Sequence, residues 1–343
     1  MARIALDAMG GDFAPEAPIE GALMAIGELD PSLEILLVGR TDPMREVLDR
    51  LIAGAYAGVA PQRDRVHLVD APDVIEMADR PTTALRHKPN SSMAVGLHLH
   101  ASGKADAFVS AGNTGAQMAG SVFQLKLHEG LTRPAIATVF PTARQPVVVL
   151  DAGANVDCSA TELVQFARLG AVYAEDILGR PKPAVALLSI GEEPEKGNAA
   201  VKDAHRRLQD TELHFVGNVE GRDILAGGSA RSAVDVVVCD GFVGNVLLKF
   251  YESVGPLIAS LLKKGGVDPR LLQEDATRSF DYSEFGGAPL LGVRGVSIIS
   301  HGSSSPRAIK NALRVALRAV ETRMNDHIGR RLAQMPADGG AGA

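Results

Sequence analysis

The sequence predicts an α/β protein with a largely parallel sheet, and three observations favour this class. Short apolar runs rich in Val, Ile and Leu recur along the 343 residues, as expected for strands covered on both faces. Segments with helical spacing separate most of these runs, which is typical of parallel sheets. Most runs also end in a cluster of Gly, Asn, Asp and Ser, the composition of a tight turn.

The apolar runs predict where the strands lie. They cover residues 3–6, 34–38, 66–69, 105–109, 135–140, 146–150, 184–190, 213–216, 234–239 and 296–300. Only the link PTARQ joins residues 135–140 to 146–150, so we expect these two strands to form an antiparallel hairpin.

Helices are predicted between the strands. Ile19, Leu23 and Ile26 share one face of an early helix, and the last long helix has a clear start. Ser305 can cap it, and Pro306 follows at the position where a missing N–H costs nothing.

We expect a single large α/β domain over residues 1–335, followed by a disordered tail of low complexity at 336–343. Residues 244–266 carry an apolar stripe interrupted by Gly255 and Pro256. A core or dimer-interface helix is the favoured interpretation of this stripe. The alternative is a kinked, projecting tip that dips into a membrane surface.

Composition excludes several function classes. A net charge of −6, 4% aromatic residues and the absence of Trp argue against nucleic acid as a partner. No apolar run approaches a membrane span, and the N-terminus lacks the features of a signal peptide. Two cysteines without metal spacing indicate neither a disulfide framework nor a metal site. We therefore expect a cytosolic protein, peripheral on a membrane at most.

Turn clusters form the main functional signal. They read DAMGGD (7–12), SAGNTGA (110–116), DAGAN (151–155), GEEPEKGN (191–198), GNVEGRD (217–223), CDGFVGN (239–245) and HGSSS (301–305). Turns that follow parallel strands open on the carboxyl edge of the sheet, where ligands of α/β folds bind. Backbone N–H groups and helix N-termini there suit an anion.

None of these clusters matches a known nucleotide or hydrolase motif. The sequence lacks GxxxxGK[ST], GxGxxG after the first strand, HExxH and GxSxG. What remains is a site of hydroxyls, amides and N–H groups, suited to an anion and an oxyanion.

Candidate substrate-binding residues lie in or beside the clusters: Asp7, Gly10, Gly11, Asp12, Ser110, Asn113, Thr114, Asp151, Asn155, Asn218, Arg222, Asp240, Ser303 and Ser304. For any single Asp, capping a turn is the more frequent role. Lys249 and Arg222 are the preferred cations for a phosphate, with solvated surface charge as the alternative. His301 is either a general acid or base or a structural histidine.

Cys158 lies near a predicted helix start, where a thiolate is favoured. A nucleophile that carries an acyl group is one interpretation of it. A small buried residue is the favoured interpretation of both Cys158 and Cys239.

The sequence resembles the bacterial phosphate acyltransferase family of phospholipid synthesis (PlsX) in eight short motifs that occur in the same order. They are DAMGGD, SAGNTGA, RPAIATVFP, LDAGAN, GNVEGRD, CDGFVGN, DYSEFGGAPLLG and HGSS. The match runs from Arg3 to about Ser305. Each phrase alone is weak, whereas the ordered set is highly specific. Gln117 departs from the pattern, because an aliphatic residue is expected there.

The resemblance implies a homodimer with a Rossmann-like α/β/α sandwich, similar to isopropylmalate dehydrogenases and phosphotransacetylases. It implies conversion of acyl-acyl carrier protein and inorganic phosphate to acyl phosphate and free carrier protein, with no cofactor. The product then feeds a membrane glycerol-3-phosphate acyltransferase, so family members are cytoplasmic and contact the membrane loosely.

For this reaction we assign catalytic roles to His301, Lys249 and Asn245. Phosphate itself attacks the thioester, Lys249 or Arg222 neutralises it, and His301 protonates the departing sulfur. Two other interpretations stay open. One is a phosphotransacetylase-like enzyme that uses short acyl-CoA, and the other is a non-catalytic acyl-carrier or lipid sensor.

Overall fold

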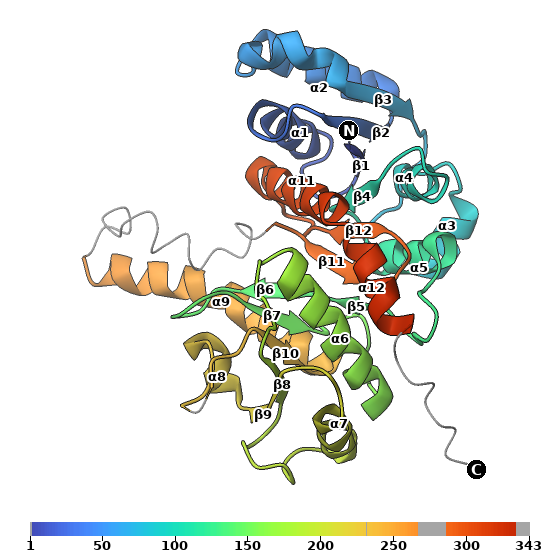
Figure 1. Ribbon diagram of the computed structural model, residues 1–343. Helices are drawn as coiled ribbons and strands as arrows, with labels where there is room; N and C mark the ends of the chain where they lie inside the picture. Colours follow the sequence, from blue (N-terminus) through green and yellow to red (C-terminus); the bar gives the residue numbers. More distant parts are fainter. Residues whose placement is uncertain (1, 231, 267–285, 334–343) are drawn as a thin grey trace. The chain divides into compact units, whose positions relative to one another are not determined.

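The computed structural model describes residues 2–230, 232–266 and 286–333 (Figure 1). The chain divides into two compact units. Unit 1 comprises Met1–His128 and Phe285–Asn325, and unit 2 comprises Glu129–Glu284 and Asp326–Ala343. The expected tail at 336–343 lies outside the described residues. Whether the two units act as the single domain expected over residues 1–335 stays a prediction.

The sheet of unit 1 is parallel except at one edge. Its strands run in the order β3-β2-β1-β4-β12-β11, and only the β11–β12 pair is antiparallel. Their bounds are β1 (Ala2–Asp7), β2 (Leu33–Gly39), β3 (Val66–Asp70), β4 (Ala107–Ser110), β11 (Ala288–Leu291) and β12 (Val296–Ile299). The sequence pattern predicted five of these strands and missed β11, a four-residue segment that contains a proline.

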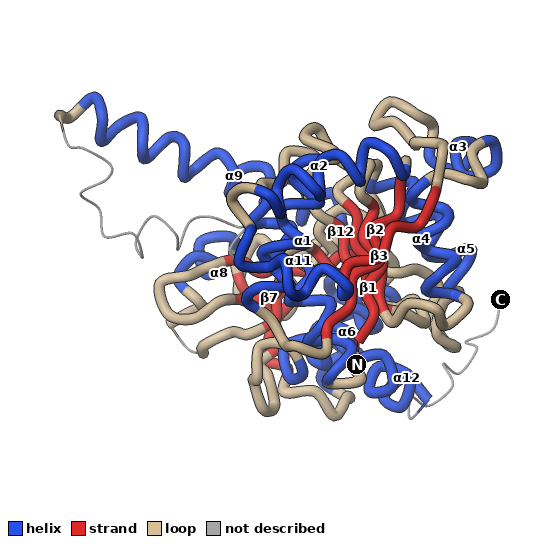
Figure 2. Tube along the Cα trace, turned by 90° about the horizontal axis from the view of Figure 1, so that it is seen from above, coloured by secondary structure: helices blue, strands red, loops and turns tan. Residues whose placement is uncertain are grey.

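Helices cover both faces of this sheet. One layer holds α1 (Glu16–Glu28), α2 (Thr41–Ala53) and α11 (Pro306–Glu321), and the other holds α3 (Pro81–His87), α4 (Ser92–Ala101) and α5 (Thr114–Leu125). Figures 1 and 2 both show α1 and α11 on one side of β1 and α4 on the other. A 3₁₀ segment, η1 (Ala57–Arg65), precedes β3. As predicted, Ser305 caps α11 through the Ala308 N–H, and Pro306 occupies its first turn.

The sheet of unit 2 runs in the order β6-β7-β10-β8-β9. The predicted antiparallel hairpin is confirmed as the β6–β7 pair, and the other neighbours are parallel. The run 135–140, predicted as one strand, is instead two, interrupted at Ala137. The bounds are β6 (Thr138–Phe140), β7 (Val147–Leu150), β8 (Val185–Leu188), β9 (Phe215–Val219) and β10 (Val236–Val238). The two-residue strand β5 (Ala135–Ile136) is not part of this sheet.

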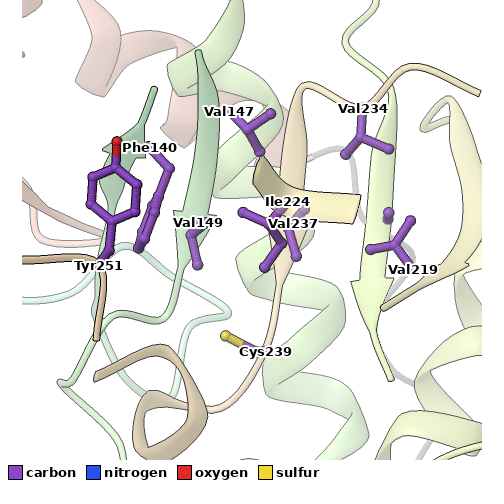
Figure 3. Packing of buried hydrophobic residues seen from close by; sticks show 10 residues of the cluster. Phe140, Val147, Val149, Val219, Ile224, Val234, Val237, Cys239 and Tyr251 are labelled. Carbon is purple, nitrogen blue, oxygen red and sulfur yellow. The ribbon is translucent and has the colours of Figure 1, made fainter. Parts of the chain in front are cut away.

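Alternating side chains of the β strands of unit 2 fill two cores. Val149 and Val237 pack with Ile224 and Tyr251 in the cluster of Figure 3. Leu150 points to the opposite face, where Gly170 allows a helix to approach closely. The helices of this unit are α6 (Ala160–Asp176), α7 (Ala199–Gln209), α8 (Gly221–Ala226) and α9 (Gly241–Lys264), and α12 (Met324–Ala333) begins at the end of unit 1.

His100 on α4 fixes two backbone groups of unit 1. Its Nε2 accepts the Val296 N–H at 2.8 Å, and its Nδ1 lies 3.0 Å from the Ala105 carbonyl oxygen. Because Nε2 is an acceptor, the ring proton belongs on Nδ1, which donates to Ala105. Burial lowers the pKa of His100, while the Ala105 carbonyl and the nearby Asp106 act in the opposite direction. The neutral ring therefore links α4 to the start of β12.

We predict an acid-sensitive contribution of His100 to stability. A second proton would sit on Nε2, against the Val296 N–H. Since the folded pKa lies below the unfolded value of about 6.5, the unfolded chain binds more protons as the pH falls below that value. The free energy of unfolding of the wild type should therefore fall from pH 7 to pH 5 more steeply than that of His100→Gln, as measured by urea denaturation.

The exposed ring of His98 provides the matched control, and His98→Gln should keep the wild-type pH slope. Equal slopes for the wild type and His100→Gln would contradict the assignment.

Candidate active site

Asp7, at the carboxyl end of β1, organises the turns of unit 1. Its Oδ2 accepts the Ser110 hydroxyl at 2.7 Å, and its Oδ1 accepts the Met9 N–H at 3.1 Å. Burial raises the pKa of Asp7, while hydrogen bonds from Ser92 and Ser110 counteract this. The carboxyl group thus joins the end of β1 to the end of β4. Sequence reasoning missed Ser92, which lies outside the turn clusters.

Gly10 and Gly11 allow three turns to meet. A Cβ on Gly10 would lie 2.8 Å from both Asp7 Oδ2 and the Gly112 nitrogen. Gly11 has a φ of +102°, and a Cβ there would lie 2.9 Å from the Gly302 carbonyl oxygen. The Asp12 N–H donates to that same oxygen at 2.7 Å. The turns after β1, β4 and β12 are therefore in direct contact.

Asn113 is held by its neighbours. Its Oδ1 accepts the Ala116 N–H and caps α5, while Nδ2 lies within 3.3 Å of the carbonyl oxygens of Glu76, Met77 and Asp79. Its amide therefore positions the segment 76–79, which no sequence motif marked. The next residue, Thr114, is exposed at the start of α5.

His301 lies exposed in the turn between β12 and α11. Its Nδ1 lies 2.7 Å from Ser303 Oγ and accepts the Ser303 N–H at 3.3 Å. An acceptor Nδ1 puts the proton of the neutral ring on Nε2. Ser304 is buried, and its N–H donates to the His301 carbonyl, so it shapes the turn.

Asp151, just after β7, is the centre of a group of backbone and side-chain N–H donors in unit 2. Its Oδ1 accepts N–H groups from Ile136, Gly153 and Ala154, and its Oδ2 accepts the backbone and side-chain N–H groups of Asn155 at 2.6 and 2.9 Å. Burial raises the pKa of Asp151, while the hydrogen bonds from Ala154, Ile136 and Asn155 counteract it. The concave run of N–H groups at 153–155 is therefore occupied by the chain's own carboxylate.

The start of α9 presses against this cluster. A Cβ on Gly244 would lie 1.8 Å from the Asp151 carbonyl oxygen, and the Gly241 N–H donates to the Asn155 carbonyl at 2.7 Å. Asp240 Oδ1 accepts the Val243 N–H, which caps the helix. Asn245 is exposed and lies beside Gly153.

Both thiols are poor nucleophiles. Burial, with the nearby Asp151 charge, raises the pKa of Cys158 to about 12. Cys239 is fully buried, and its pKa is raised well above the usual thiol value, mainly by desolvation. The favoured sequence interpretation, a small buried residue, is confirmed for Cys239, whereas Cys158 is only half-buried.

Three predicted residues of unit 2 are not among the hydrogen-bond partners of Asp151. Asn218 lies within β9, where its Oδ1 meets His205 Nδ1 at 2.9 Å and its Nδ2 donates to the Glu193 carbonyl. Arg222 is 75% exposed and pairs with Glu220. Lys249 pairs with Glu252 at 2.9 Å on α9. The strand β9 also runs on through Val219, so the turn expected from Gly217 begins later.

Gln117 belongs to the interior of unit 1. It is fully buried, and its Nε2 donates to Ser297 Oγ and to the Ile298 carbonyl oxygen. The polar group that departs from the family pattern thus packs α5 against β12. Within the described ranges, no group of three His, Cys, Asp or Glu side chains is arranged to hold a metal ion.

Comparison with known proteins decides the family. The model of a family described as fatty acid synthesis protein matches residues 2–327. A phosphate acyltransferase of Heliobacterium modesticaldum is 48% identical over 93% of this chain and 94% of its own length. One of Desulforamulus reducens is 49% identical over 94% of each chain. The chain belongs to the phosphate acyltransferase family. It is therefore an enzyme, an acyltransferase.

Solved structures confirm the predicted fold. A phosphotransacetylase from Streptococcus pyogenes aligns with a TM-score of 0.63 at 17% identity, over 93% of this chain and 94% of that one. A branched-chain phosphotransacylase from Enterococcus faecalis gives a TM-score of 0.60 at 18% identity, over 93% and 99%. The mixed α/β fold with mostly parallel sheets is thus shared with phosphotransacetylases.

We predict that Asp151→Asn strongly destabilises this acyltransferase. The variant puts an NH₂ group where one carboxylate oxygen accepts N–H groups. It also removes the negative charge that strengthens the hydrogen bonds to the other oxygen. Charge-assisted hydrogen bonds contribute about 1.5–3 kcal/mol each, so the expected loss in unfolding free energy is about 3 kcal/mol or more. Urea denaturation measures it.

Asp157→Asn, at an exposed position six residues on, is the matched control and should stay within about 0.5 kcal/mol of the wild type. If both variants unfold at the wild-type urea concentration, the Asp151 carboxylate does not organise the turn.

Proposed function

We propose that the chain transfers an acyl group from acyl-acyl carrier protein to inorganic phosphate, which yields acyl phosphate and free carrier protein. The observation that carries this proposal is that relatives named phosphate acyltransferase match the chain along nearly its whole length. The turns at the carboxyl edges supply chemistry of the kind this reaction needs, without a cofactor.

The turns of unit 1 favour that unit for phosphate binding. The run of N–H groups at 153–155 in unit 2 is already filled by Asp151. In unit 1, by contrast, the N-termini of α5 and α11 open onto the edge where the turns meet, and each end carries partial positive charge. The Asp12 carboxylate lies beside the turn at Gly302, 3.4 Å from where a Cβ on that glycine would be, and its negative charge repels anions. Phosphate therefore binds on the side of exposed Thr114.

The reaction is a direct displacement. A phosphate oxygen attacks the thioester carbonyl carbon, the carbonyl oxygen becomes an oxyanion held by N–H or hydroxyl donors, and the C–S bond then breaks. The carrier thiolate leaves and takes a proton. Protonated His301 is the proposed donor. It gives its Nε2 proton to the sulfur and returns to the neutral ring, the proton lost by the attacking hydrogen phosphate restores its protonated form, and Ser303 holds the ring through Nδ1.

Lys249, Arg222 and Asn245 stay candidates in the same reaction. The exposed pairs Lys249–Glu252 and Arg222–Glu220 must open before either cation meets phosphate. Such exposed pairs contribute about 1 kcal/mol or less, so phosphate can compete with them.

We predict phosphate-dependent release of carrier thiol by the purified protein. Acyl-acyl carrier protein and acyl-CoA are compared at equal concentrations, with and without inorganic phosphate, and free thiol and acyl phosphate are quantified. The carrier substrate should turn over faster, with one acyl phosphate formed per thiol. Faster phosphate-dependent release from acyl-CoA would favour a phosphotransacetylase-like enzyme, and binding without turnover would favour a sensor.

The same assay tests direct displacement. Cys158→Ser and Cys239→Ser should keep near-normal turnover, because the high thiol pKa values leave little thiolate at neutral pH. A trapped acyl-cysteine would overturn this mechanism.

Helix α9 supports peripheral membrane contact. Val243, Leu247 and Tyr251 cover the core of unit 2, yet large apolar side chains on the helix are also exposed: Phe242 (62%), Val246 (52%), Phe250 (65%), Leu257 (57%) and Leu261 (57%). An exposed stripe of this kind marks an interaction surface. We propose that α9 meets a membrane surface from a cytoplasmic homodimer, whose acyl phosphate passes to a membrane glycerol-3-phosphate acyltransferase.

The described helices include none that is long and apolar enough to cross a membrane. Figures 1 and 2 show the later part of α9 extending beyond the sheet of unit 2, as surface contact by a helix side requires. The helix runs without interruption through Pro256 to Lys264.

We expect Leu257→Ser/Leu261→Ser to weaken co-sedimentation with vesicles containing anionic lipid, because the change removes apolar surface from the proposed contact. Leu225→Ser, at an exposed apolar residue of α8, is the matched control and should sediment like the wild type. Unchanged sedimentation of the double variant, together with a dimer that dissociates, would reassign the stripe to the subunit interface.

A further inference from the structure

We propose that the layer formed by α3, α4 and α5 is the surface on which unit 1 docks the acyl carrier protein. The proposal rests on the proposed function, and it adds where the acidic partner binds. It is carried by the sign of the charges on this layer, by an exposed aromatic residue within it, and by its connection to the turns of unit 1.

The layer carries mainly positive charge, and of its cations Lys88 is paired with Asp79 of the adjoining segment 76–79. Between Arg80 and His128 the chain has five Lys or Arg residues, four His residues and a single acid, Asp106, in a protein whose net charge is −6. The Asp106 carboxylate accepts the backbone N–H of Arg3 at 2.7 Å. Arg80, Arg86 and Lys104 are exposed, and none of the described carboxylates lies within ion-pair distance of them.

The three helices form one continuous surface. Both α3 and α4 pack on α5, and close approach is possible because Gly120 of α5 faces Leu85 and Leu97. Figures 1 and 2 both show the three helices on the same side of the sheet of unit 1. At 1.5 Å per residue the 12 residues of α5 extend about 18 Å, so the roughly 800 Å² that each partner buries in a specific complex requires α3 and α4 as well.

An exposed aromatic residue provides an apolar anchor within the basic surface. Phe123 on α5 is 74% exposed, and Lys126 Nζ lies 4.9 Å from its ring centroid. Aromatic residues surrounded by charge are frequent centres of binding energy in protein interfaces. Duplex DNA and anionic lipid share the negative charge of a carrier protein, but a lone aromatic anchor among few cations fits a protein partner better.

The layer leads directly to the candidate site. Asn113 caps α5 and binds segment 76–79, which in turn leads into Arg80 and α3. A carrier protein seated on α3 and α5 therefore lies next to Thr114, at the edge where the turns of unit 1 meet. The acyl thioester on its prosthetic arm enters from that edge.

The opposite layer has a different charge pattern. α1 and α2 carry Glu and Asp residues that pair with neighbouring cations, as in Arg50–Glu16, Arg45–Asp42 and Lys310–Glu28. Mixed charge gives an acidic partner no comparable attraction. This layer therefore supplies a control with the same change in net charge.

The test compares the double variant Arg86→Glu/Lys126→Glu with Arg45→Glu/Arg318→Glu on the opposite layer. Each variant changes the net charge by the same amount. The KM for acyl-acyl carrier protein should rise about tenfold in the first variant while kcat at saturation stays at the wild-type value. The second variant should keep the wild-type KM.

Phe123→Ala should raise KM without any change in charge, and added salt should raise the wild-type KM towards that of the first variant.

A wild-type KM in Arg86→Glu/Lys126→Glu, or an equal rise in both double variants, would overturn the docking surface while leaving the proposed function intact. A variant that loses binding to anionic vesicles or duplex DNA, and not to the carrier protein, would assign the layer to that other partner and overturn the proposal. If the wild type itself shows no phosphate-dependent turnover of the carrier substrate, the proposed function fails before the variants are compared.

Discussion

A buried carboxylate at the end of a parallel strand is the constraint on which each unit depends. A carboxylate removed from water must be satisfied by donors, or its burial costs several kcal/mol. Asp7 recruits the Met9 N–H and the Ser110 hydroxyl, and Asp151 recruits five N–H groups. The turns of both units are shaped around these oxygens. The glycines beside them, Gly10 and Gly244, are needed because a side chain would collide with the aspartate or its backbone.

The hydrogen bonds of Asp7 and Asp151 give the turns of the two units different roles. In unit 2 the chain's own carboxylate fills the run of N–H groups, so the turn is a rigid support for the start of α9. In unit 1 the buried carboxylate holds strand ends together and leaves the helix N-termini facing the edge. An aspartate at a strand end therefore need not touch substrate to be essential for the site.

Much of the fold could be predicted from the sequence because its signals are local. Val/Ile/Leu runs predicted the buried parallel strands, and a five-residue link predicted the β6–β7 hairpin. β11 was missed because four residues with a proline carry no periodicity, and its pairing with β12 is set by tertiary contact. Turn composition also pointed to Asp7, Ser110 and Asp151, and the structure shows Asp7 bonded to Ser110 in unit 1 and Asp151 bonded to its own turn in unit 2. Turn composition could not reveal that the side-chain amides of Asn113 and Asn218 donate to carbonyl groups distant in the sequence. Those carbonyl groups lie 34 to 37 residues from Asn113 and 25 residues from Asn218.

Helix α9 also limits how the protein behaves in solution. Its inner side chains are needed for the core of unit 2, so the outer apolar stripe cannot be hidden by rotating the helix. Whenever nothing covers that stripe, the molecule exposes an apolar surface to water, and such surfaces promote aggregation. Colloidal stability thus depends on whether this exposed apolar stripe is covered. The cell, in turn, has a reason to keep the concentration of uncovered molecules low.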